Sequence, residues 1–585
     1  MNAQRTASLL SPSVAVPQEP PSSFPESPVL ARVLGLIPIL EQYRRMPFTD
    51  DPADFAGHAL EALAIRARTQ GENLDSLPSS GPLLLAVNHP FGGVEGLVLA
   101  ALFSRVRLDC KILVNHMLYG ISELRRLFIP VEVFGGKKSG MGNVSGVRAA
   151  MRHLEAGGSL VIFPAGAVSY WHPRRHRVTD PEWSPFVGRL ARVAGTSVVP
   201  LYFEGRNSLI FQVAGYLHPV LRTVLLPREM WRMRGREVRL TVGSVVDPDV
   251  LSALHNDVSR AAYIRACCYT LGRKAVPVAC RTVPVAAPRA RGALRDEVAS
   301  LRKDILADDG NFQVFPARGN AAPRILHEIG RLREETFRAA QEGSGNAVDI
   351  DRFDPHYTHL ILWNKNVEAI AGSYRVRVFF PDGARGSLKK MYTASLFRFQ
   401  PDFFERCGIA MELGRAFVTR EYQRDYAPLL MLWKGIARLA VRNGVRTLFG
   451  ACSIGLGYAP ESIHMLRRCL EEYHFAPDLA GLAQGRRPPA PFPGPNEPHA
   501  RGLDYKLLNR AVKNLEGGKG LPILFKHYLQ LGGRIAAFHE DASFGTLDAL
   551  TVVDLTAIPE KTLARYLGRE YAPRPERNIP QPSPP

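Results

Sequence analysis

The sequence lacks a long apolar run. None of its 585 residues belongs to an uninterrupted apolar stretch of about 18 or more, whereas a membrane-spanning helix needs about 20. The N-terminal stretch 1–26 is rich in serine and proline and has no apolar core of the kind found in signal peptides. These absences predict that no helix crosses a membrane, that any membrane attachment is peripheral, and that the first residues are disordered.

Cysteine is scarce and follows no metal-binding pattern. The seven cysteines are scattered along the chain, which is typical of reduced thiols in a cytosolic protein. No zinc-ligand spacing, RNA-binding aromatic motif or basic zipper helix occurs. Neither a metal site nor a nucleic-acid partner is therefore expected.

Acidic residues are fewer than basic ones. The chain has 55 Asp and Glu against 74 Lys and Arg, a net charge of +19. Such a balance favours an acidic partner, and the candidates are an anionic membrane leaflet and an acidic acyl carrier protein. The apolar share of 46% is that of globular proteins, and the length predicts two or three domains.

A histidine and a glutamate lie in a glycine-rich segment, 88–96. The apolar run 83–87 before it predicts a buried strand, and the run 97–103 after it predicts the start of a helix. A histidine on such a corner, His89, with an acid nearby to orient its ring, Glu95, can take a proton from an attacking hydroxyl. A purely structural histidine is the alternative for this pair on its own.

Two more strand-ending turns follow. Segment 160–169 is a strand that ends in Pro164, Ala165 and Gly166, whose backbone N–H groups can face a developing oxyanion. Segment 196–208 is another apolar strand with a polar corner. In this order the three motifs resemble the glycerolipid (lysophosphatidic acid-type) acyltransferase family over roughly residues 60–272, which implies His89 as base and Glu95 as its partner.

The resemblance includes two departures from the family pattern. Five residues rather than four separate His89 from its acid, and Ala165 stands where the family has glutamate. Both departures resemble the hemolysin-like or amino-acid-lipid branch and argue against a glycerol-phosphate acceptor. Lys137 and Lys138 are expected to contact a carrier or a phosphate-like group, with solvated lysines as the alternative.

Two segments, 29–44 and 209–239, mix apolar residues with arginine. A basic, apolar face suits a membrane interface, and an ordinary core-facing helix with a solvated basic side is the equal alternative. Proline is expected to interrupt the first segment at Pro38.

The chain divides at a Pro-, Ala- and Arg-rich stretch, 274–292, that reads as a linker. The predicted boundaries are a disordered N-terminus at 1–28, a first domain at 29–272, a linker at 273–293, a second domain at 294–568 and a disordered tail at 569–585.

The second domain has its own pattern of elements. A predicted helix is followed by strands, a second helix and a further strand, at 325–338, 358–363, 367–380, 410–418, 428–441 and 447–454. This order resembles the GNAT-type N-acyltransferase fold. The expected fold class is therefore α/β with α+β character, an acyltransferase-type domain followed by a GNAT-like domain.

Within 323–555 the chain more narrowly resembles the acyl-carrier-protein-dependent N-acyltransferase that makes lyso-ornithine lipid. The markers are Arg331-Leu332-Arg333, Glu342-Gly343-Ser344-Gly345, Tyr374-Arg375, Glu412-Leu413-Gly414-Arg415 and Leu432-Trp433-Lys434-Gly435-Ile436. No Arg/Gln-x-x-Gly-x-Gly/Ala loop for the pyrophosphate of coenzyme A occurs. An acyl carrier protein is therefore the expected donor, and no cofactor is needed.

Several charged residues of the second domain are candidate site residues. Glu412 is either a base for the attacking amine or the ion-pair partner of Arg333, Arg375 or Arg415. The three arginines are expected to contact substrate, and Arg415 anchors either a substrate carboxylate or Glu412. The segment after the first predicted helix contains three aspartates, Asp349, Asp351 and Asp354. They are expected either to attract a cationic amino acid or to form a solvated loop. A calcium site is not expected, because the glutamate that would complete it is missing.

The whole architecture resembles the family of bifunctional ornithine lipid synthases. The resemblance implies N-acylation of ornithine with a 3-hydroxyacyl group, followed by O-acylation of the new hydroxyl, on the cytoplasmic face of the inner membrane. Three alternatives stay open: a lysophospholipid acyltransferase with a regulatory second domain, a synthase of another amino-acid lipid such as a glycine or glutamine lipid, and a peripheral scaffold or lytic protein.

Overall fold

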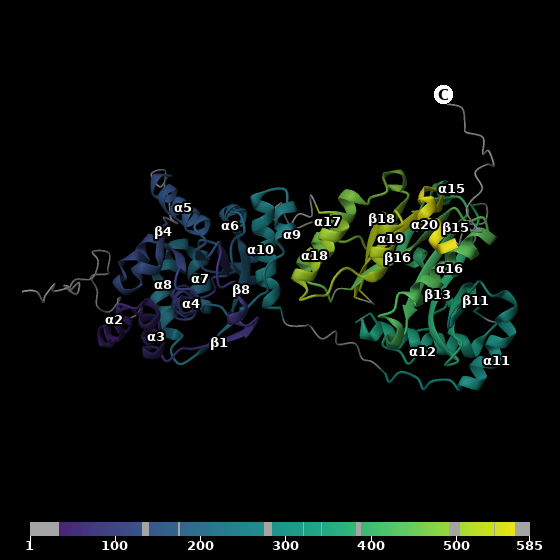
Figure 1. Cartoon of the computed structure of the whole chain (residues 1–585), viewed down its shortest axis with the longest axis horizontal. Helices are drawn as coiled ribbons and strands as arrows, with labels where there is room; N and C mark the ends of the chain where they lie inside the picture. Colours follow the sequence, from purple (N-terminus) through teal and green to yellow (C-terminus); the bar gives the residue numbers. More distant parts are fainter. Residues whose placement is uncertain are drawn as a thin grey trace, which may run out of the picture. The chain divides into compact units, whose positions relative to one another are not determined.

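The chain folds into two compact units, the first made of residues up to 246 with 267–272, the second of 247–266 with the rest (Figure 1). The computed structural model describes residues 34–131, 140–173, 176–273, 283–319, 321–340, 342–381, 388–455, 457–490, 503–542 and 545–567. Lys137 and Lys138, the predicted termini 1–28 and 569–585, and 274–282 of the predicted linker lie outside the described residues. Helix α10 (Asp257–Leu271) is divided between the two units.

The first unit contains a seven-stranded sheet. Its order is β1-β9-β8-β2-β5-β3-β4, and every pairing is parallel except β8 with β9. The strands are β1 (Arg66–Gly71), β2 (Leu83–Val87), β3 (Lys111–Asn115), β4 (Phe128–Val131), β5 (Ser159–Ile162), β8 (Ser197–Glu204) and β9 (Glu237–Val242). The predicted strand 83–87 is thus the central strand β2, buried at every position.

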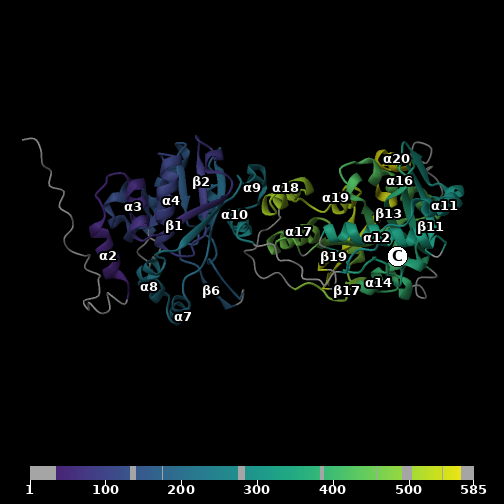
Figure 2. The ribbon, with the colours of Figure 1, turned by 90° about the horizontal axis from the view of Figure 1, so that it is seen from below.

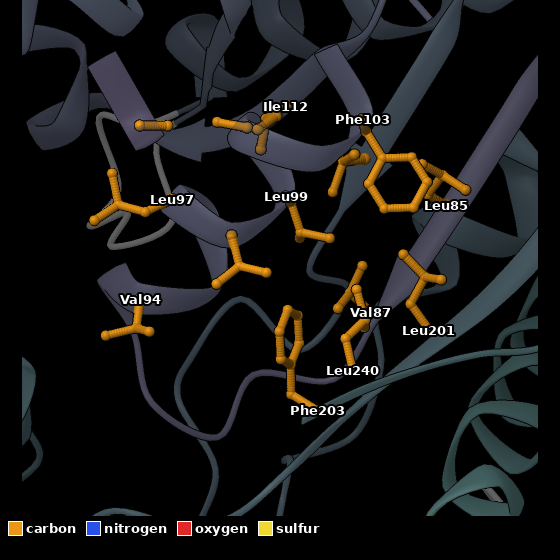
Figure 3. Close-up of a cluster of buried hydrophobic side chains, with 14 of the residues drawn as sticks. Leu85, Val87, Val94, Leu97, Leu99, Phe103, Ile112, Leu201, Phe203 and Leu240 are labelled. Carbon is orange, nitrogen blue, oxygen red and sulfur yellow. The ribbon is translucent and has the colours of Figure 1, made fainter. Parts of the chain in front are cut away.

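Helix α4 (Gly93–Val106) supplies the apolar face that covers this sheet. Figure 3 shows Leu99 and Phe103 of α4 on the side of the helix that faces strand side chains such as Val87, and all three are buried. Because parallel strands lie side by side, their carboxyl ends meet at one edge, and β2 and β5 deliver the two predicted motifs to that edge.

The arginine-rich segments form short helices rather than one long one. Segment 209–239 becomes α7 (Leu209–Leu217), α8 (Pro219–Arg232) and the start of β9. Helix α2 (Leu36–Arg45) runs through Pro38, where an interruption was expected. Pro38 lies in the first helical turn, where no intrahelical N–H bond is lost, so the expectation was wrong at this position. Within the described ranges, none of the helices has both the length and the hydropathy to cross a bilayer.

The second unit contains an eight-stranded sheet in the order β10-β11-β12-β13-β15-β16-β19-β18. All pairings are antiparallel except β15 with β16. The strands are β10 (Ala307–Asp309), β11 (Phe312–Arg318), β12 (Thr358–Asn364), β13 (Ala369–Phe379), β15 (Ala410–Val418), β16 (Thr447–Gly455), β18 (Arg534–Asp541) and β19 (Thr546–Asp554).

Two long helices cover opposite faces of this sheet, α12 (Pro323–Ala339) and α16 (Ala427–Arg442) (Figure 2). Ile325 and Ile329 of α12 belong to the same core cluster as Phe315, whereas Gly435 of α16 lies against the neighbouring Val314. Successive strand residues point to opposite faces, so the sheet is buried on both sides. The remaining helices of the unit are α9 (Pro248–Ala253), α11 (Arg291–Leu301), α17 (Pro460–Tyr473), α18 (Tyr505–Leu515), α19 (Ile523–Gln530) and α20 (Glu560–Leu567), with shorter turns α14 (Thr393–Leu396) and α15 (Asp402–Cys407).

Strands β15 and β16 stay together over only three residue pairs. Their register runs from Ala410 opposite Thr447 to Glu412 opposite Phe449, although both strands continue for six residues more. A bulge in β15 accompanies the split, because Arg415 and Ala416 face the single residue Tyr374 of β13. Arg415 has φ +49°, a left-handed conformation that is rare for a residue with a side chain.

Candidate active sites

The His89 loop joins the end of β2 to the start of α4 through a glycine corner. Gly92 has φ +109°, which only glycine adopts readily, and a Cβ there would contact Leu226 of α8 at 2.9 Å. Asn88 fixes the start of the loop to β8: its amide donates to the Phe203 carbonyl at 3.0 Å and accepts from the Phe203 N–H at 2.6 Å.

His89 and Glu95 lie side by side as the sequence predicts. His89 Nδ1 is 3.3 Å from Glu95 Oε1, and the imidazole is 18% exposed while the carboxylate is completely buried. The same carboxylate oxygen accepts the N–H of Phe91 at 2.6 Å. Glu95 lies in the first turn of α4, where the helix dipole favours a negative charge. The extra residue in the spacer therefore does not separate the pair.

Asp180 holds the backbone of His89, and the sequence analysis missed it. Its Oδ1 accepts the N–H of His89 at 3.1 Å, and its Oδ2 accepts the indole N–H of Trp183 at 2.9 Å. The N–H of Ser169 donates to the His89 carbonyl at 2.8 Å, and the Ser169 hydroxyl donates to Asp180. These residues are distant in sequence, and no local pattern around Asp180 marks it.

The predicted oxyanion turn lies next to the imidazole. The Phe163 ring, which precedes Pro164, has its centroid 4.4 Å from that of His89. Gly166 has φ +63° and its N–H donates to the Phe163 carbonyl at 3.1 Å, so the turn itself uses that group. Proline has no N–H. Among the three predicted residues, the Ala165 N–H is the donor that the turn leaves for an oxyanion.

In the second unit, the predicted arginines form a buried ion network. Arg333 pairs with Asp349 at 2.7 Å and with Asp354 at 3.1 Å, and Arg375 pairs with Asp351 at 2.8 Å and with Asp354 at 3.1 Å. Burial alone would raise the pKa of Asp354, but the charges of the two arginines outweigh it and hold the pKa well below its ordinary value.

The acidic loop is therefore not solvated, and that interpretation was wrong. Asp349 and Asp354 are buried, and both carboxylate oxygens of Asp351 accept hydrogen bonds from Arg375 at 2.8 Å. The guanidiniums of Arg333 and Arg375 are each 1% exposed. This enclosure favours a structural role for the two arginines over the predicted contact with substrate, and the buried Asp349 and Asp354 are not available to a cationic amino acid.

Arg415 lies at the edge of the same network. It approaches Asp349 at 3.4 Å and Asp351 at 3.6 Å, and its guanidinium lies 5.1 Å from the centroid of the Tyr392 ring. The bulge of β15 places it there. At 10% exposure it is the most accessible of the three predicted arginines, so its role as a substrate anchor stays a prediction.

Glu412 is enclosed beneath the segment that begins α14. The Tyr357 hydroxyl donates to one carboxylate oxygen, and the N–H of Thr393 donates to the other at 2.7 Å. Neither Arg333 nor Arg375 pairs with it. Burial raises the pKa of Glu412, although these hydrogen bonds oppose the rise. The Tyr357 hydroxyl also accepts the Tyr392 N–H at 2.7 Å, so it joins Glu412 to the backbone of Tyr392.

Two carboxylates near this split, Glu342 and Asp548, were given no role by the sequence analysis. Burial and the charge of Asp548 raise the pKa of Glu342 to about 7. Burial raises the pKa of Asp548 to about 6, against the hydrogen bond that Ser453 of β16 donates at 2.6 Å. A signal for Asp548 was available in the sequence, because it is an aspartate within the apolar strand β19. Glu342 is the first residue of the Glu342-Gly343-Ser344-Gly345 marker, to which the sequence analysis assigned no chemical role.

These raised pKa values predict that the second unit loses stability as the pH rises. A carboxylate whose folded pKa lies above its unfolded pKa stabilises the fold at low pH and ceases to do so as the pH rises through the folded value. For Glu342 and Asp548 that window runs from about pH 4 to about pH 7. We expect a loss on the order of 1–3 kcal/mol between pH 5 and pH 8.

This loss can be measured by urea unfolding of the full chain at pH 5 and pH 8. Hydrogen exchange of peptides from the second unit reports the unfolding of that unit. Glu342→Gln is expected to reduce the pH dependence, and Glu540→Gln, an exposed carboxylate of β18, is expected to leave it unchanged. A wild-type stability that does not change between the two pH values would contradict the assignment.

Comparison with known proteins assigns each unit to an acyltransferase type. A family model described as "Acyltransferase" matches residues 43–275, and one described as "Acetyltransferase (GNAT) domain" matches residues 332–434. The two matches lie in the order that the sequence analysis expected, and the fold is of the mixed α/β class with an acyltransferase-type domain and a GNAT domain.

Curated relatives carry names of both kinds of acyl transfer. The chain is 30% identical over 302 residues to the glycine N(alpha)-acyltransferase of Phocaeicola vulgatus, which covers 47% of this chain and 89% of the relative. It is 26% identical over 231 residues to the lyso-glycine lipid O-acyltransferase of the same organism, covering 37% and 77%. It is 27% identical over 257 residues to the L-ornithine N(alpha)-acyltransferase of Rhodobacter capsulatus, covering 41% and 89%.

Proposed function

This chain is an acyltransferase that belongs to the amino-acid Nα-acyltransferase family of the Phocaeicola vulgatus enzyme and carries a second acyltransferase domain ahead of the GNAT domain, and we propose that it makes a two-chain amino-acid lipid. The second unit joins a 3-hydroxyacyl group to the α-amine of ornithine. The first unit then acylates the 3-hydroxyl of that product. An acyl carrier protein supplies both acyl groups, at the inner-membrane surface.

The proposal rests mainly on one observation: the same chain contains the His89 site and a GNAT domain in whose sheet β15 and β16 separate after three residue pairs. The imidazole has its Nδ1 3.3 Å from a carboxylate oxygen of Glu95, is partly exposed, and lies beside the Pro164–Gly166 turn, in which the Ala165 N–H is left for an oxyanion. Such a pair serves a hydroxyl acceptor. The split sheet belongs to the unit whose relatives are named for amine acceptors. One chain thus holds the parts for an amide and for an ester.

The ester step needs a base, an oxyanion donor and a leaving thiol. His89 Nε2 takes the proton of the 3-hydroxyl as its oxygen attacks the thioester carbonyl carbon, and the Ala165 N–H stabilises the oxyanion. Collapse of the intermediate breaks the C–S bond. The thiolate of the carrier leaves with the proton from His89, so the products are an ester and a thiol.

The amide step follows the same course with an amine as nucleophile. An α-ammonium loses one proton before it attacks and a second as the amide forms, and the departing thiolate takes one of them. The other proton needs an acceptor near the split. Glu342, which is partly exposed and has a pKa of about 7, suits this task better than the enclosed Glu412. Glu412 instead holds Thr393 and, through Tyr357, Tyr392, and we propose that it positions this segment.

The net charge of +19 supports an acyl carrier protein as donor, because carrier proteins are acidic. The missing pyrophosphate loop supports the same choice over coenzyme A.

Glycine is the second candidate for the head group. Identity to the glycine enzyme, 30%, exceeds identity to the ornithine enzyme, 27%. The burial of Asp349 and Asp354, and the pairing of Asp351 with Arg375, also remove one source of attraction for the side-chain ammonium of ornithine. The carboxylate of Glu342, which is only partly buried, remains for that ammonium, and ornithine is therefore kept as the first candidate.

Lipid analysis of a host that lacks aminolipids tests the proposal. We expect the full chain, co-expressed with an acyl carrier protein, to yield an N-acyl lyso-lipid and its O-acylated derivative, both detected by mass spectrometry. Isotopically labelled ornithine and labelled glycine, supplied in parallel, assign the head group.

The outcomes separate the alternatives. If the lipids carry the isotope from labelled glycine and none from labelled ornithine, glycine is the head group instead of ornithine. Newly acylated phospholipid without an aminolipid would favour the lysophospholipid acyltransferase. An unchanged lipid profile would remove the synthase proposal.

A further inference from the structure

Helices α7 and α8 expose apolar side chains that a core-facing helix would bury. The exposed residues of α7 recur at the spacing of one helix face, and those of α8 continue the pattern after a short turn. Their exposed fractions run from 39% for Leu221 to 79% for Tyr216. The set, named here the hairpin face, comprises Leu209, Ile210, Val213, Tyr216, Leu217, Val220, Leu221 and Val224. Of the two interpretations of segment 209–239, the core-facing helix is therefore wrong for this face.

The hairpin face is accompanied by positive charge. Segment 206–236 contains six arginines and one acidic residue, Glu229. Glu229 is buried, and Arg228 and Arg232 approach it at 3.1 and 3.2 Å, while Arg234 and Arg236 are exposed. Helix α2, from the other arginine-rich segment, packs against α8. A face of this composition complements an anionic lipid surface, which takes apolar side chains between its lipids and attracts arginine to its phosphates.

Three consecutive residues connect this hairpin to the His89 loop. The Ser169 N–H donates to the His89 carbonyl. The next side chain, Tyr170, lies under the Arg222 guanidinium of α8 at 4.0 Å, and the N–H of Trp171 donates to Gln212 of α7 at 2.8 Å. Trp171 is itself 40% exposed, and tryptophan is favoured at the boundary of lipid and water.

A second set of contacts joins the hairpin to the same loop from the other side. Leu226 of α8 packs on Gly92, and Met230 packs on Gly93. Asn207, just before α7, donates to the Phe91 carbonyl at 3.3 Å. Helices α7 and α8 thus pack on the His89 loop through residues outside the hairpin face, so the face lies on the same two helices that contact the loop.

From these contacts we propose that the hairpin face, together with Trp171, is the surface by which the first unit docks on an anionic bilayer. The His89 site then opens beside the lipid surface, and a lyso-lipid presents its hydroxyl to the imidazole without leaving the leaflet. The docking follows from the exposed residues alone, and only this delivery to His89 rests on the proposed O-acylation.

Binding to vesicles tests the docking with the full chain. We expect it to sediment with vesicles of phosphatidylcholine and phosphatidylglycerol and more weakly with phosphatidylcholine alone. The double change Val213→Glu with Tyr216→Glu is expected to lower partitioning about tenfold or more, because two carboxylates would have to enter the lipid interface. Arg234→Glu with Arg236→Glu is expected to weaken binding to the anionic vesicles only.

Leu108→Glu is the matched control. Leu108 is 95% exposed and follows the end of α4 that is remote from the His89 loop, so this variant is expected to bind vesicles as the wild type does. Wild-type protein that stays in solution with anionic vesicles would overturn the proposal. The proposal would also be overturned if the hairpin face mediates self-association or binding of acyl carrier protein. Sedimentation velocity would then show a complex that Tyr216→Glu dissociates.

Acyl transfer to a short-chain, water-soluble hydroxyl acceptor separates this inference from the proposed function. If docking fails but this transfer occurs, the inference is wrong and the O-acyltransferase proposal stands. If docking occurs and no such transfer is found, the proposed function is at fault. If the variant with Val213→Glu and Tyr216→Glu still transfers an acyl group to the water-soluble acceptor, its first unit is folded.

Discussion

Replacing His89 with alanine is expected to stop the pathway at the single-chain lipid. In the proposed mechanism the imidazole is the base of the ester step, and such a base contributes about 10²–10⁴-fold to the rate. The proposed amide step belongs to the other unit and needs no residue of the first. Cells that express His89→Ala should therefore accumulate the N-acyl lyso-lipid, with the O-acylated product lowered by about that factor. Mass spectrometry of the lipid extract measures both species.

Two variants make this result specific. His116→Ala removes an exposed histidine of the same unit, just after β3, and is expected to leave the ratio of the two lipids unchanged. Glu412→Gln disturbs the second unit and is expected to lower both lipids together. A His89→Ala variant with normal product would show that His89 is a structural histidine.

Replacing Asp354 with asparagine is expected to cost more stability than any surface change in the second unit. Asp354 pairs with both Arg333 and Arg375, and all three side chains are at most 1% exposed. Removing one partner of a buried ion pair leaves a charge without compensation, at a cost on the order of 3–5 kcal/mol. Hydrogen exchange of peptides from 323–418 in the full chain should show this loss.

Asp308→Asn provides the control. Asp308 pairs with Lys365 at 2.7 Å in the same sheet, but its side chain is 45% exposed, and exposed pairs contribute about 0–1 kcal/mol. Equal losses in the two variants would contradict the structural role of the network. The pKa of Asp354 is held below its ordinary value, so the stabilisation is fully present above about pH 4 and declines only as the pH falls further.

Local patterns in the sequence were sufficient for the His89 motif. A buried strand, a glycine corner and an amphipathic helix each have a short-range signal, and Glu95 is close enough in sequence to His89 for one turn of α4 to bring them together. The same holds for the order of elements in the second unit. The sequence also identified the arginines of the network, because they belong to recognisable segments.

The partners of those residues were not predictable from local patterns. Asp180 reaches His89 across 91 positions of the chain, and Asp354 meets Arg375 across 21. A charged loop such as 349–354 looks solvated in sequence, since burial depends on what packs over it. Arg333 and Arg375 belong to α12 and β13, and only their approach in space gives the aspartates countercharges.

The sequence by itself thus determined the two acyltransferase domains, their order, and the histidine and glutamate of the first site, because each depends on residues within one or two elements. Only the tertiary structure decided which charges are buried, which N–H of the Pro164–Gly166 turn remains for an oxyanion, and which face of segment 209–239 is exposed. These properties depend on contacts between elements that are distant along the chain, and burial and electrostatics act through those contacts.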